Sequence, residues 1–96
     1  MQDWEWEIAD PERLDEYRAL LDTPELSESE RISLVEMLLE CFEVLAHDGA
    51  LDARWEQLDR YLTAHHALHA STLAYWSDGP FKIAEAVRRI VERRAP

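Results

Sequence analysis

The sequence is poor in cysteine, in glycine and in long apolar runs, and each shortage excludes a class of protein. Cys41 is the only cysteine, so no internal disulfide can form, and we expect it to be buried as a small apolar residue. Gly49 and Gly79 are the only glycines, which excludes a glycine-rich phosphate-binding loop. No apolar run approaches the roughly 20 residues of a membrane span, and the acidic start is unlike a signal peptide. We therefore expect a cytoplasmic protein that does not bind membranes.

Basic residues are also scarce, and they are unevenly placed. The chain of 96 residues has 21 acidic and 10 basic residues, which gives a net charge of −11. Eleven of the acidic residues lie in the first thirty positions, where Arg13 and Arg18 are the only basic ones, whereas residues 61–96 carry a net charge of +2. A field of this sign repels nucleic acid and anionic membrane and attracts basic surfaces. We expect a basic protein as the partner and no direct binding of nucleic acid.

Apolar residues are abundant at helical spacing, and they predict an all-α fold. Hydrophobic residues make up 47% of the chain, too many for a disordered acidic tail. The clearest helix begins at a capping box formed by Ser27 and Glu30, continues through the apolar positions of residues 31–46, and ends at Gly49, where we expect a left-handed cap. We predict one domain over residues 1–96, a compact bundle of four to five short helices around this central one.

The first nine residues do not follow the helical pattern. Trp4, Trp6 and Ile8 alternate with acidic residues, which is typical of an extended segment. We expect an extended arm over residues 1–9 that packs its tryptophans on the helices or, alternatively, docks them on a partner, because tryptophan is enriched at binding hot spots. Asp10 is expected to cap a first helix that ends at Thr23-Pro24.

Local signals also divide the C-terminal half of the chain. Asp52 is expected to cap a third helix. Residues 53–77 form either one helix or two, and in the second case Ser71 is the candidate cap. The sequence Ser-Asp-Gly-Pro at residues 77–80 predicts a break. A last helix follows, and the face expected to be buried comprises Phe81, Ala84, Val87 and Val91, flanked by Ile83 and Ile90.

One polar line on the central helix is the main candidate for a binding surface. Glu36, Glu40 and Glu43, here called the acidic ridge, are spaced four and three residues apart, and His47 follows one turn later. The acidic ridge is either the solvated side of the helix or the window through which the helix meets a partner. Paired carboxylates can act as general acid and base, but no other sequence feature indicates a pocket or a raised pKa. We therefore expect no enzyme activity and no cofactor.

Three histidines near the middle of the chain suggest a metal site as an alternative. His65 and His69 lie four residues apart, and His66 lies between them. The pattern His-Glu-x-x-His of zinc proteases is not met, because no glutamate stands at the second position. A structural zinc site needs four ligands. We favour histidines that border the core or cap a helix end over a metal site at His65 and His69.

Several of these pieces together resemble the small colicin and pyocin DNase immunity proteins. The pieces are the serine-capped acidic helix ending in Phe42 and His47-Asp48-Gly49, the pair Tyr75-Trp76, and Asp78-x-Pro80 before Ile83, Val87 and Ile90. Members of that family are acidic four-helix bacterial proteins that bind and block a basic nuclease toxin. The resemblance implies that the acidic ridge meets the toxin and that Tyr75 and Trp76 anchor it. Residues 50–70 depart from the family pattern by adding a helix, and Trp76 replaces a tyrosine.

Two functions are compatible with these features. The first is an inhibitory binding module, such as an immunity protein, an antitoxin or a nucleic-acid mimic, in which carboxylates steer a basic partner and aromatic side chains anchor it. The second is a structural or adaptor bundle, in which Trp4, Trp6, Tyr75 and Trp76 line the contact of a homodimer. The histidine metal site is a third and separate alternative.

Overall fold

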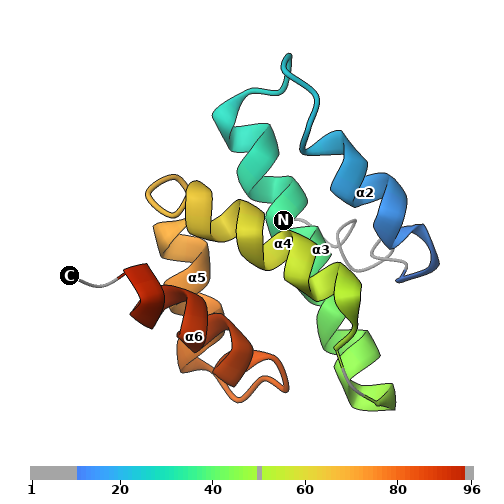
Figure 1. Ribbon diagram of the computed structural model, residues 1–96, viewed down its shortest axis with the longest axis vertical. Helices are drawn as coiled ribbons and strands as arrows, with labels where there is room; N and C mark the ends of the chain where they lie inside the picture. The colour runs from blue at the N-terminus through green and yellow to red at the C-terminus, as the bar shows by residue number, and fades with distance from the viewer. Residues whose placement is uncertain (1–10, 50, 95–96) are drawn as a thin grey trace, which may run out of the picture.

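Within residues 11–49 and 51–94, which are the residues that the computed structural model describes, every regular element is helical (Figure 1). The elements are the 3₁₀ turn η1 (Pro11–Arg13) and the α-helices α2 (Leu14–Leu20), α3 (Glu28–Asp48), α4 (Ala53–Ala64), α5 (Ala70–Asp78) and α6 (Ala84–Arg94). The radius of gyration of 12.5 Å is close to the value of about 13 Å for a compact chain of this length. The prediction of an all-α bundle is confirmed. The predicted arm of residues 1–9, with Trp4 and Trp6, lies outside the described residues, as does Asp10.

Helix α3 begins at the predicted capping box. The Ser27 hydroxyl accepts a hydrogen bond from the Glu30 backbone N–H at 3.1 Å, and the Glu30 carboxylate accepts one from the Ser27 N–H at 2.8 Å. Seven residues of α3 are buried, and Cys41 is among them, as predicted. In Figure 1, α2 lies beside the N-terminal half of α3, and α4 crosses α3 near its middle. None of the described helices is long and apolar enough to cross a membrane.

The end of α3 differs from the prediction. Gly49 has a φ of 171°, which is extended backbone, so the expected left-handed cap is wrong. Its N–H still donates to the Ala46 carbonyl oxygen at 3.4 Å. Asp52 caps α4 as predicted, because its carboxylate accepts a hydrogen bond from the Arg54 N–H at 2.9 Å.

Helix α2 ends earlier than predicted. Its last residue is Leu20, and the N–H groups of Leu21, Asp22 and Thr23 each donate to the carbonyl oxygen three residues earlier. These bonds are of the 3₁₀ type, which tightens the end of the helix into a turn before proline is reached. Leu14, Tyr17 and Leu21 are buried, as their spacing predicts.

Residues 53–77 form two helices rather than one, and Ser71 does not cap the second. His69 occupies the N-cap position of α5, and Ser71 is exposed in its first turn. The turn places the His69 side chain in the core, where it is 0% exposed. Its hydrogen bond to the Tyr61 hydroxyl, 2.9 Å long, joins α5 back to α4. The start of α5 thus has no side-chain cap and is held to α4 by this tertiary contact.

Helix α6 packs on α5 and α4 (Figure 1), and its buried face is rotated from the predicted one. Phe81 lies in the turn before the helix, because α6 begins only at Ala84. The residues that are fully buried are Ile83, Val87 and Ile90, whereas Val91 is only partly buried. Ala84 and Val87 are buried as predicted, and Ile83 and Ile90, which were expected only to flank the face, are buried with them.

Candidate functional site

A cavity of about 350 Å³ lies where the C-terminal half of α3 meets the end of α5 and the turn to α6. It is here called the ridge cavity, and it is lined by Glu40, Glu43, Val44, His47, Tyr75, Trp76 and Phe81. The structure therefore brings together four of the residues that sequence reasoning singled out for partner binding. Glu36, the first member of the acidic ridge, is half-buried one turn earlier on α3 and does not line the cavity.

Three aromatic rings form one wall of the ridge cavity. The ring centroids of Trp76 and Phe81 are 4.3 Å apart, and those of Tyr75 and Phe81 are 5.6 Å apart. Trp76 is 4% exposed, whereas Tyr75 is 66% exposed. The resemblance implied that both residues anchor a partner, but Trp76 belongs to the core and only Tyr75 presents its ring to solvent. Sequence reasoning did not single out Phe81 for binding, because its spacing suggested a core position.

Gly79 allows the Phe81 ring to reach this wall. A Cβ atom at residue 79 would lie 2.8 Å from Cδ2 and 3.0 Å from Cζ of that ring, closer than real side chains pack. The break that the sequence predicted at residues 77–80 therefore has a second role, since a residue without a side chain leaves room for the ring.

Glu43 joins α3 to the segment that begins α6, at the edge of the ridge cavity. Its two carboxylate oxygens accept hydrogen bonds from the backbone N–H groups of Lys82, at 2.8 Å, and Ile83, at 3.0 Å. His47 Nε2 lies 3.3 Å from the same carboxylate, whose side chain is only 14% exposed. A carboxylate is favourable at this place because the first N–H groups of a helix lack partners and carry a partial positive charge. Glu43 therefore has a structural role, because it joins α3 to the start of α6, in addition to lining the cavity.

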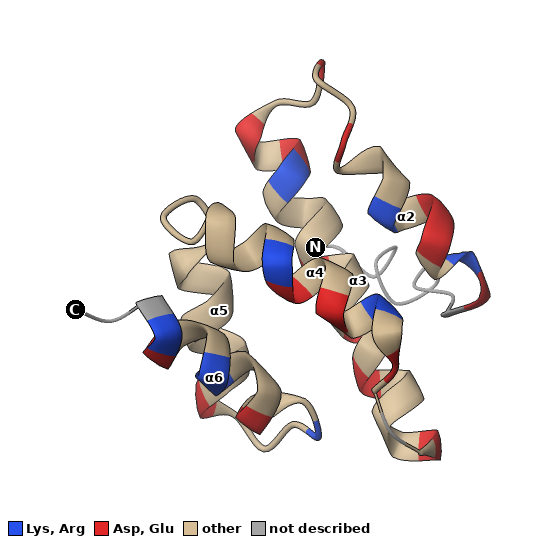
Figure 2. Cartoon of the chain, in the orientation of Figure 1, with Lys and Arg blue, Asp and Glu red and all other residues tan. Residues whose placement is uncertain are grey.

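The charge of the protein is not cancelled by its ion pairs. Among the described residues, five arginines form ion pairs with acidic side chains; the pairs are Arg13–Glu16, Arg18–Asp22, Arg54–Asp52, Arg89–Glu85 and Arg93–Asp59. Ten basic residues cannot neutralise 21 acidic ones, so a large negative excess persists. Figure 2 shows acidic residues along α2, α3 and α4, and both acidic and basic residues on α6, which lies on the side of the molecule away from α2.

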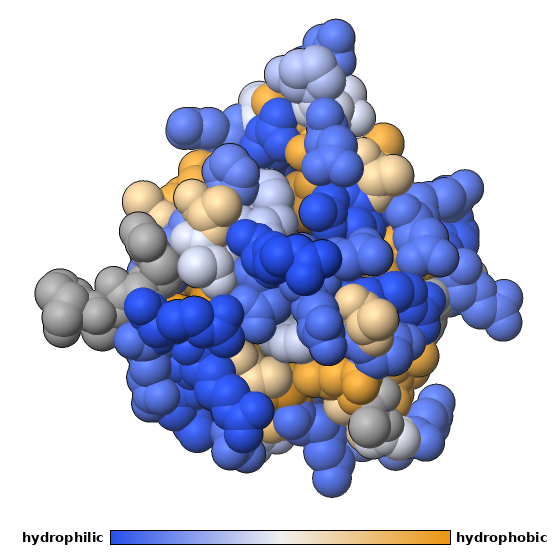
Figure 3. All heavy atoms as spheres, viewed as in Figure 1, coloured by the Kyte–Doolittle hydropathy of each residue, from blue (hydrophilic) through white to orange (hydrophobic). Residues whose placement is uncertain are grey.

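The surface seen in Figure 3 is mainly hydrophilic, as expected for a chain with 32% charged residues. An apolar area interrupts it near the bottom of the view, where Figure 1 has the lower end of α3 beside the turn from α5 to α6. Among the large apolar side chains, Tyr75, Leu20 and Val44 are the most exposed of the described residues, at 66%, 48% and 45%. Two of the three, Tyr75 and Val44, line the ridge cavity.

A second cavity, of about 420 Å³, lies between the turn that joins α2 to α3 and the first half of α3. Its lining residues are Leu20, Leu26, Ser29, Glu30, Ser33, Leu34 and Met37. This cavity was not predicted from the sequence. The one signal that pointed to it is Leu26, an apolar residue that lies outside every predicted helix. Its one carboxylate, that of Glu30, is already used in the capping box. Although larger, this cavity gathers fewer polar groups than the ridge cavity, so the ridge cavity is the better candidate.

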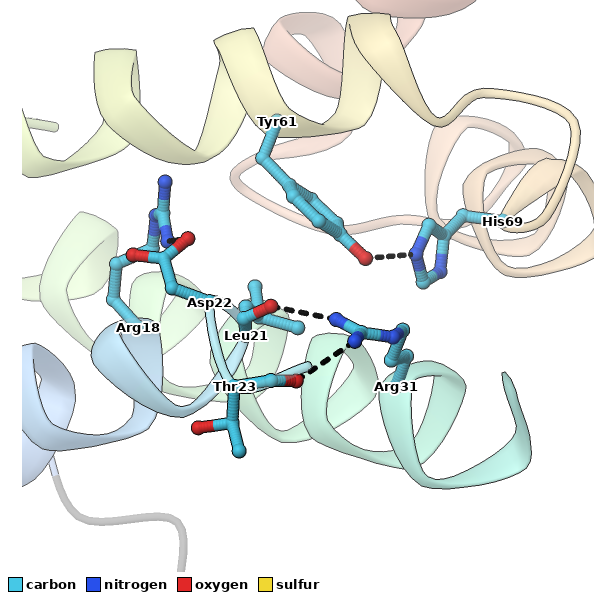
Figure 4. A network of polar contacts seen from close by, with 7 residues as sticks. All are labelled: Arg18, Leu21, Asp22, Thr23, Arg31, Tyr61 and His69. Atoms are coloured by element: carbon cyan, nitrogen blue, oxygen red, sulfur yellow. Dashed lines mark hydrogen bonds and ion pairs between the residues drawn. The ribbon is translucent and has the colours of Figure 1, made fainter. Parts of the chain in front are cut away.

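His65, His66 and His69 do not line the ridge cavity; they lie in and near a buried polar contact. Figure 4 shows Tyr61 and His69 pointing toward each other above Arg31, whose guanidinium donates to the backbone oxygens of Leu21, at 2.6 Å, and Thr23, at 2.8 Å. Burial lowers the pKa of His69 to about 4, with smaller contributions from the nearby charges, and burial raises the pKa of Tyr61. His69 is therefore uncharged at neutral pH.

This arrangement does not resemble a metal centre. The His65 ring lies against the Tyr61 ring, with centroids 4.5 Å apart, and His65 is exposed on the turn between α4 and α5. His65 and His69 approach Tyr61 from that turn, so they do not share one face of a helix as their spacing suggested. In the part of the chain that is described, no three His, Cys, Asp or Glu side chains are grouped closely enough to hold a metal ion.

Comparisons of the chain with models of protein families, with curated proteins and with solved structures find no match. The resemblance to the DNase immunity proteins thus stays a prediction from the motifs quoted above. The ridge cavity is the place where four of the residues expected to bind a partner gather.

Proposed function

We propose that this protein is an acidic binding module that neutralises a basic protein partner through the ridge cavity and the surface around it. The observation that carries the proposal is that Glu40 and Glu43 line the same cavity as the exposed ring of Tyr75. Negative charge steers a basic partner toward the protein and raises the association rate. An exposed aromatic ring supplies the kind of anchor on which binding free energy concentrates.

The support beneath Tyr75 favours a binding role for its ring. A ring that is 66% exposed contributes little to the core, yet this one lies against Phe81 and Trp76. Its position is thus set before a partner arrives, and less side-chain entropy is lost on binding. We extend the proposal to a cytoplasmic bacterial inhibitor of a nuclease toxin, on the resemblance of α3 and the Tyr75-Trp76 pair to that class.

Affinity capture from the native source, followed by binding kinetics on the captured protein, tests the proposal. We expect the captured partner to be basic and its association rate to fall steeply with ionic strength. Tyr75→Ala is expected to weaken binding at least tenfold, since a hot-spot residue contributes about 2 kcal/mol or more. Glu40→Gln is expected to slow association. Glu25→Gln, the same change at an exposed turn residue outside the cavity, is the matched control.

An association rate that does not depend on salt would argue against the proposal. So would a Tyr75→Ala variant that binds the partner as tightly as the wild-type protein does. If Glu25→Gln slows association as much as Glu40→Gln does, the partner responds to total charge and not to the ridge cavity.

A homodimer is the second candidate function, and one observation favours it. Tyr75 and Val44 are both exposed and line the same cavity, so two copies could bury these side chains against each other. Sedimentation at micromolar concentration distinguishes the two candidates. A dimer that Tyr75→Ala dissociates would support the adaptor function, and a monomer at all accessible concentrations would exclude it.

A further inference from the structure

We infer that the ridge cavity receives one arginine side chain of the partner, inserted between the aromatic wall and the carboxylates of α3. This inference rests on the proposed function for the source of the arginine, but the recognition itself follows from the cavity. A volume of about 350 Å³ lies at the small end of the range of roughly 300–1,000 Å³ for ligand pockets. It suits one long side chain better than a helix or a strand.

The residues that line the cavity offer what a guanidinium group requires. Tyr75, Trp76 and Phe81 supply aromatic rings, and Glu40 and Glu43 supply carboxylates from α3. A cation over an aromatic face is attracted by the ring quadrupole when it lies within about 6 Å of the centroid. Carboxylates bind a guanidinium through charge-assisted hydrogen bonds, which are often paired. The apolar part of an arginine side chain would pack against Val44, which is 45% exposed.

The Glu43 carboxylate is positioned before any partner binds. Its hydrogen bonds to the N–H groups of Lys82 and Ile83 hold it between α3 and α6. A carboxylate has about four acceptor positions, so two backbone N–H groups and the neighbouring His47 do not use its full capacity. Because the group is already ordered, binding a cation loses little of its rotamer entropy.

The charges around the cavity favour a cation despite the helix end beside it. The N-terminus of α6 contributes roughly half a positive charge, and Lys82 follows Phe81 directly in the chain. Glu40 and Glu43 supply two negative charges at the cavity itself, within a protein whose net charge is −11 when histidine is neutral. An acidic side chain of a partner would therefore be repelled, and an uncharged one would gain nothing from this negative charge.

Arginine fits this site better than lysine. A guanidinium group is planar, so it can stack on the Tyr75 or Phe81 ring while its edge faces the carboxylates. An ammonium group is a strongly hydrated point charge and satisfies only one of these contacts well. The rings and the carboxylates that line the same cavity suit the flat face and the edge of a guanidinium, respectively.

The test is a titration of the ¹⁵N-labelled protein with N-acetyl-arginine amide, followed by NMR. We expect saturable shifts of the Trp76 indole N–H and of the amides of Val44, His47 and Tyr75, and no comparable shifts in α2. The lysine analogue should bind at least threefold more weakly, and the uncharged citrulline analogue should produce no saturable shift. Tyr75→Ala and Glu40→Gln should each weaken arginine binding at least threefold, whereas Glu25→Gln should not.

Three results would overturn the inference: equal binding of the arginine and citrulline analogues, shifts that avoid the ridge cavity, or full affinity in both cavity variants. Tyr75 is exposed, and a dispersed spectrum of Tyr75→Ala verifies that this variant is folded. The outcome is independent of the proposed function. Arginine binding without any basic partner on capture would contradict only the function. A captured partner that needs Tyr75, with no arginine analogue bound, would contradict only this inference.

Discussion

The contact between Glu43 and the start of α6 leads to a quantitative prediction about stability. Glu43 accepts hydrogen bonds from two backbone N–H groups that lie 39 and 40 positions further along the chain. The Glu43→Ala substitution removes both acceptors and leaves those groups at the end of a packed helix. One of them belongs to Ile83, which is 0% exposed, and the other to Lys82, which is exposed.

The size of the expected effect follows from these exposures. A hydrogen bond to a charged group contributes about 1.5–3 kcal/mol to stability. Water can replace the lost partner at Lys82 but not fully at Ile83, so we expect Glu43→Ala to lower the free energy of unfolding by about 2–3 kcal/mol. For a domain of this size the melting temperature should fall by roughly 10–20 °C. Urea unfolding followed by circular dichroism measures the first quantity, and a thermal scan measures the second.

Two further variants test the reasoning. Glu43→Gln retains one acceptor oxygen and loses the charge, so its effect should lie between those of wild type and Glu43→Ala. Glu92→Ala makes the same charge change at an exposed position of α6, and surface changes of this kind usually stay within about 0.5 kcal/mol. If Glu43→Ala is no more destabilising than Glu92→Ala, the carboxylate does not hold α6, and the account of this contact is wrong.

Three more predictions concern the core and the cavity wall. Burial lowers the pKa of His69 to about 4 from an ordinary 6.5, so between these pH values the unfolded chain binds a proton that the native state does not, and the free energy of unfolding falls as pH falls. Urea unfolding should show that this free energy drops by about 2 kcal/mol more between pH 7 and 5 in wild type than in His69→Leu. Equal drops in the two proteins would refute this. Trp76→Ala should lower the free energy of unfolding by about 3–5 kcal/mol, and Tyr75→Ala by less than about 1 kcal/mol. If urea unfolding gives similar decreases for the two variants, the reasoning from their different burial is wrong. Gly79→Ala should lower the free energy of unfolding by about 1–2 kcal/mol, because the new methyl group displaces the Phe81 ring. The same change should have a much smaller effect in a Phe81→Ala background. Additive effects in this double-mutant cycle would exclude the clash.

The elements that were predicted well are those whose signals are local. The capping box at Ser27, the cap at Asp52 and the break after Asp78 each depend on residues within four positions of one another. Other helix ends were predicted poorly even where a local signal was present, as at Pro24, Gly49 and Ser71. The start of α5 depends on where His69 is buried, and the start of α6 depends on an acceptor supplied by Glu43 from another helix.

Most residues of the candidate site were predicted from the sequence, but their meeting in one cavity was not. Spacing identified the acidic ridge, and composition drew attention to Tyr75 and Trp76, yet neither shows that α3 and α5 meet at these positions. Adjacent residues on a helix point about 100° apart, so one of two neighbouring aromatic residues can face the core while the other faces solvent. Nothing local distinguishes them, because both side chains are large aromatic rings that carry one polar group. The packing of α5 against α6 decides that Trp76 is buried and Tyr75 exposed.

The sequence by itself determined the helical class, the strong negative charge and most of the core, because hydrophobic periodicity and charge are properties of the chain before it folds. Only the tertiary structure decided which carboxylates share a cavity with which rings, and that Glu43 joins two helices distant in sequence. The physical reason is that such contacts depend on the rotation and crossing of packed helices. These quantities are set by the whole core at once.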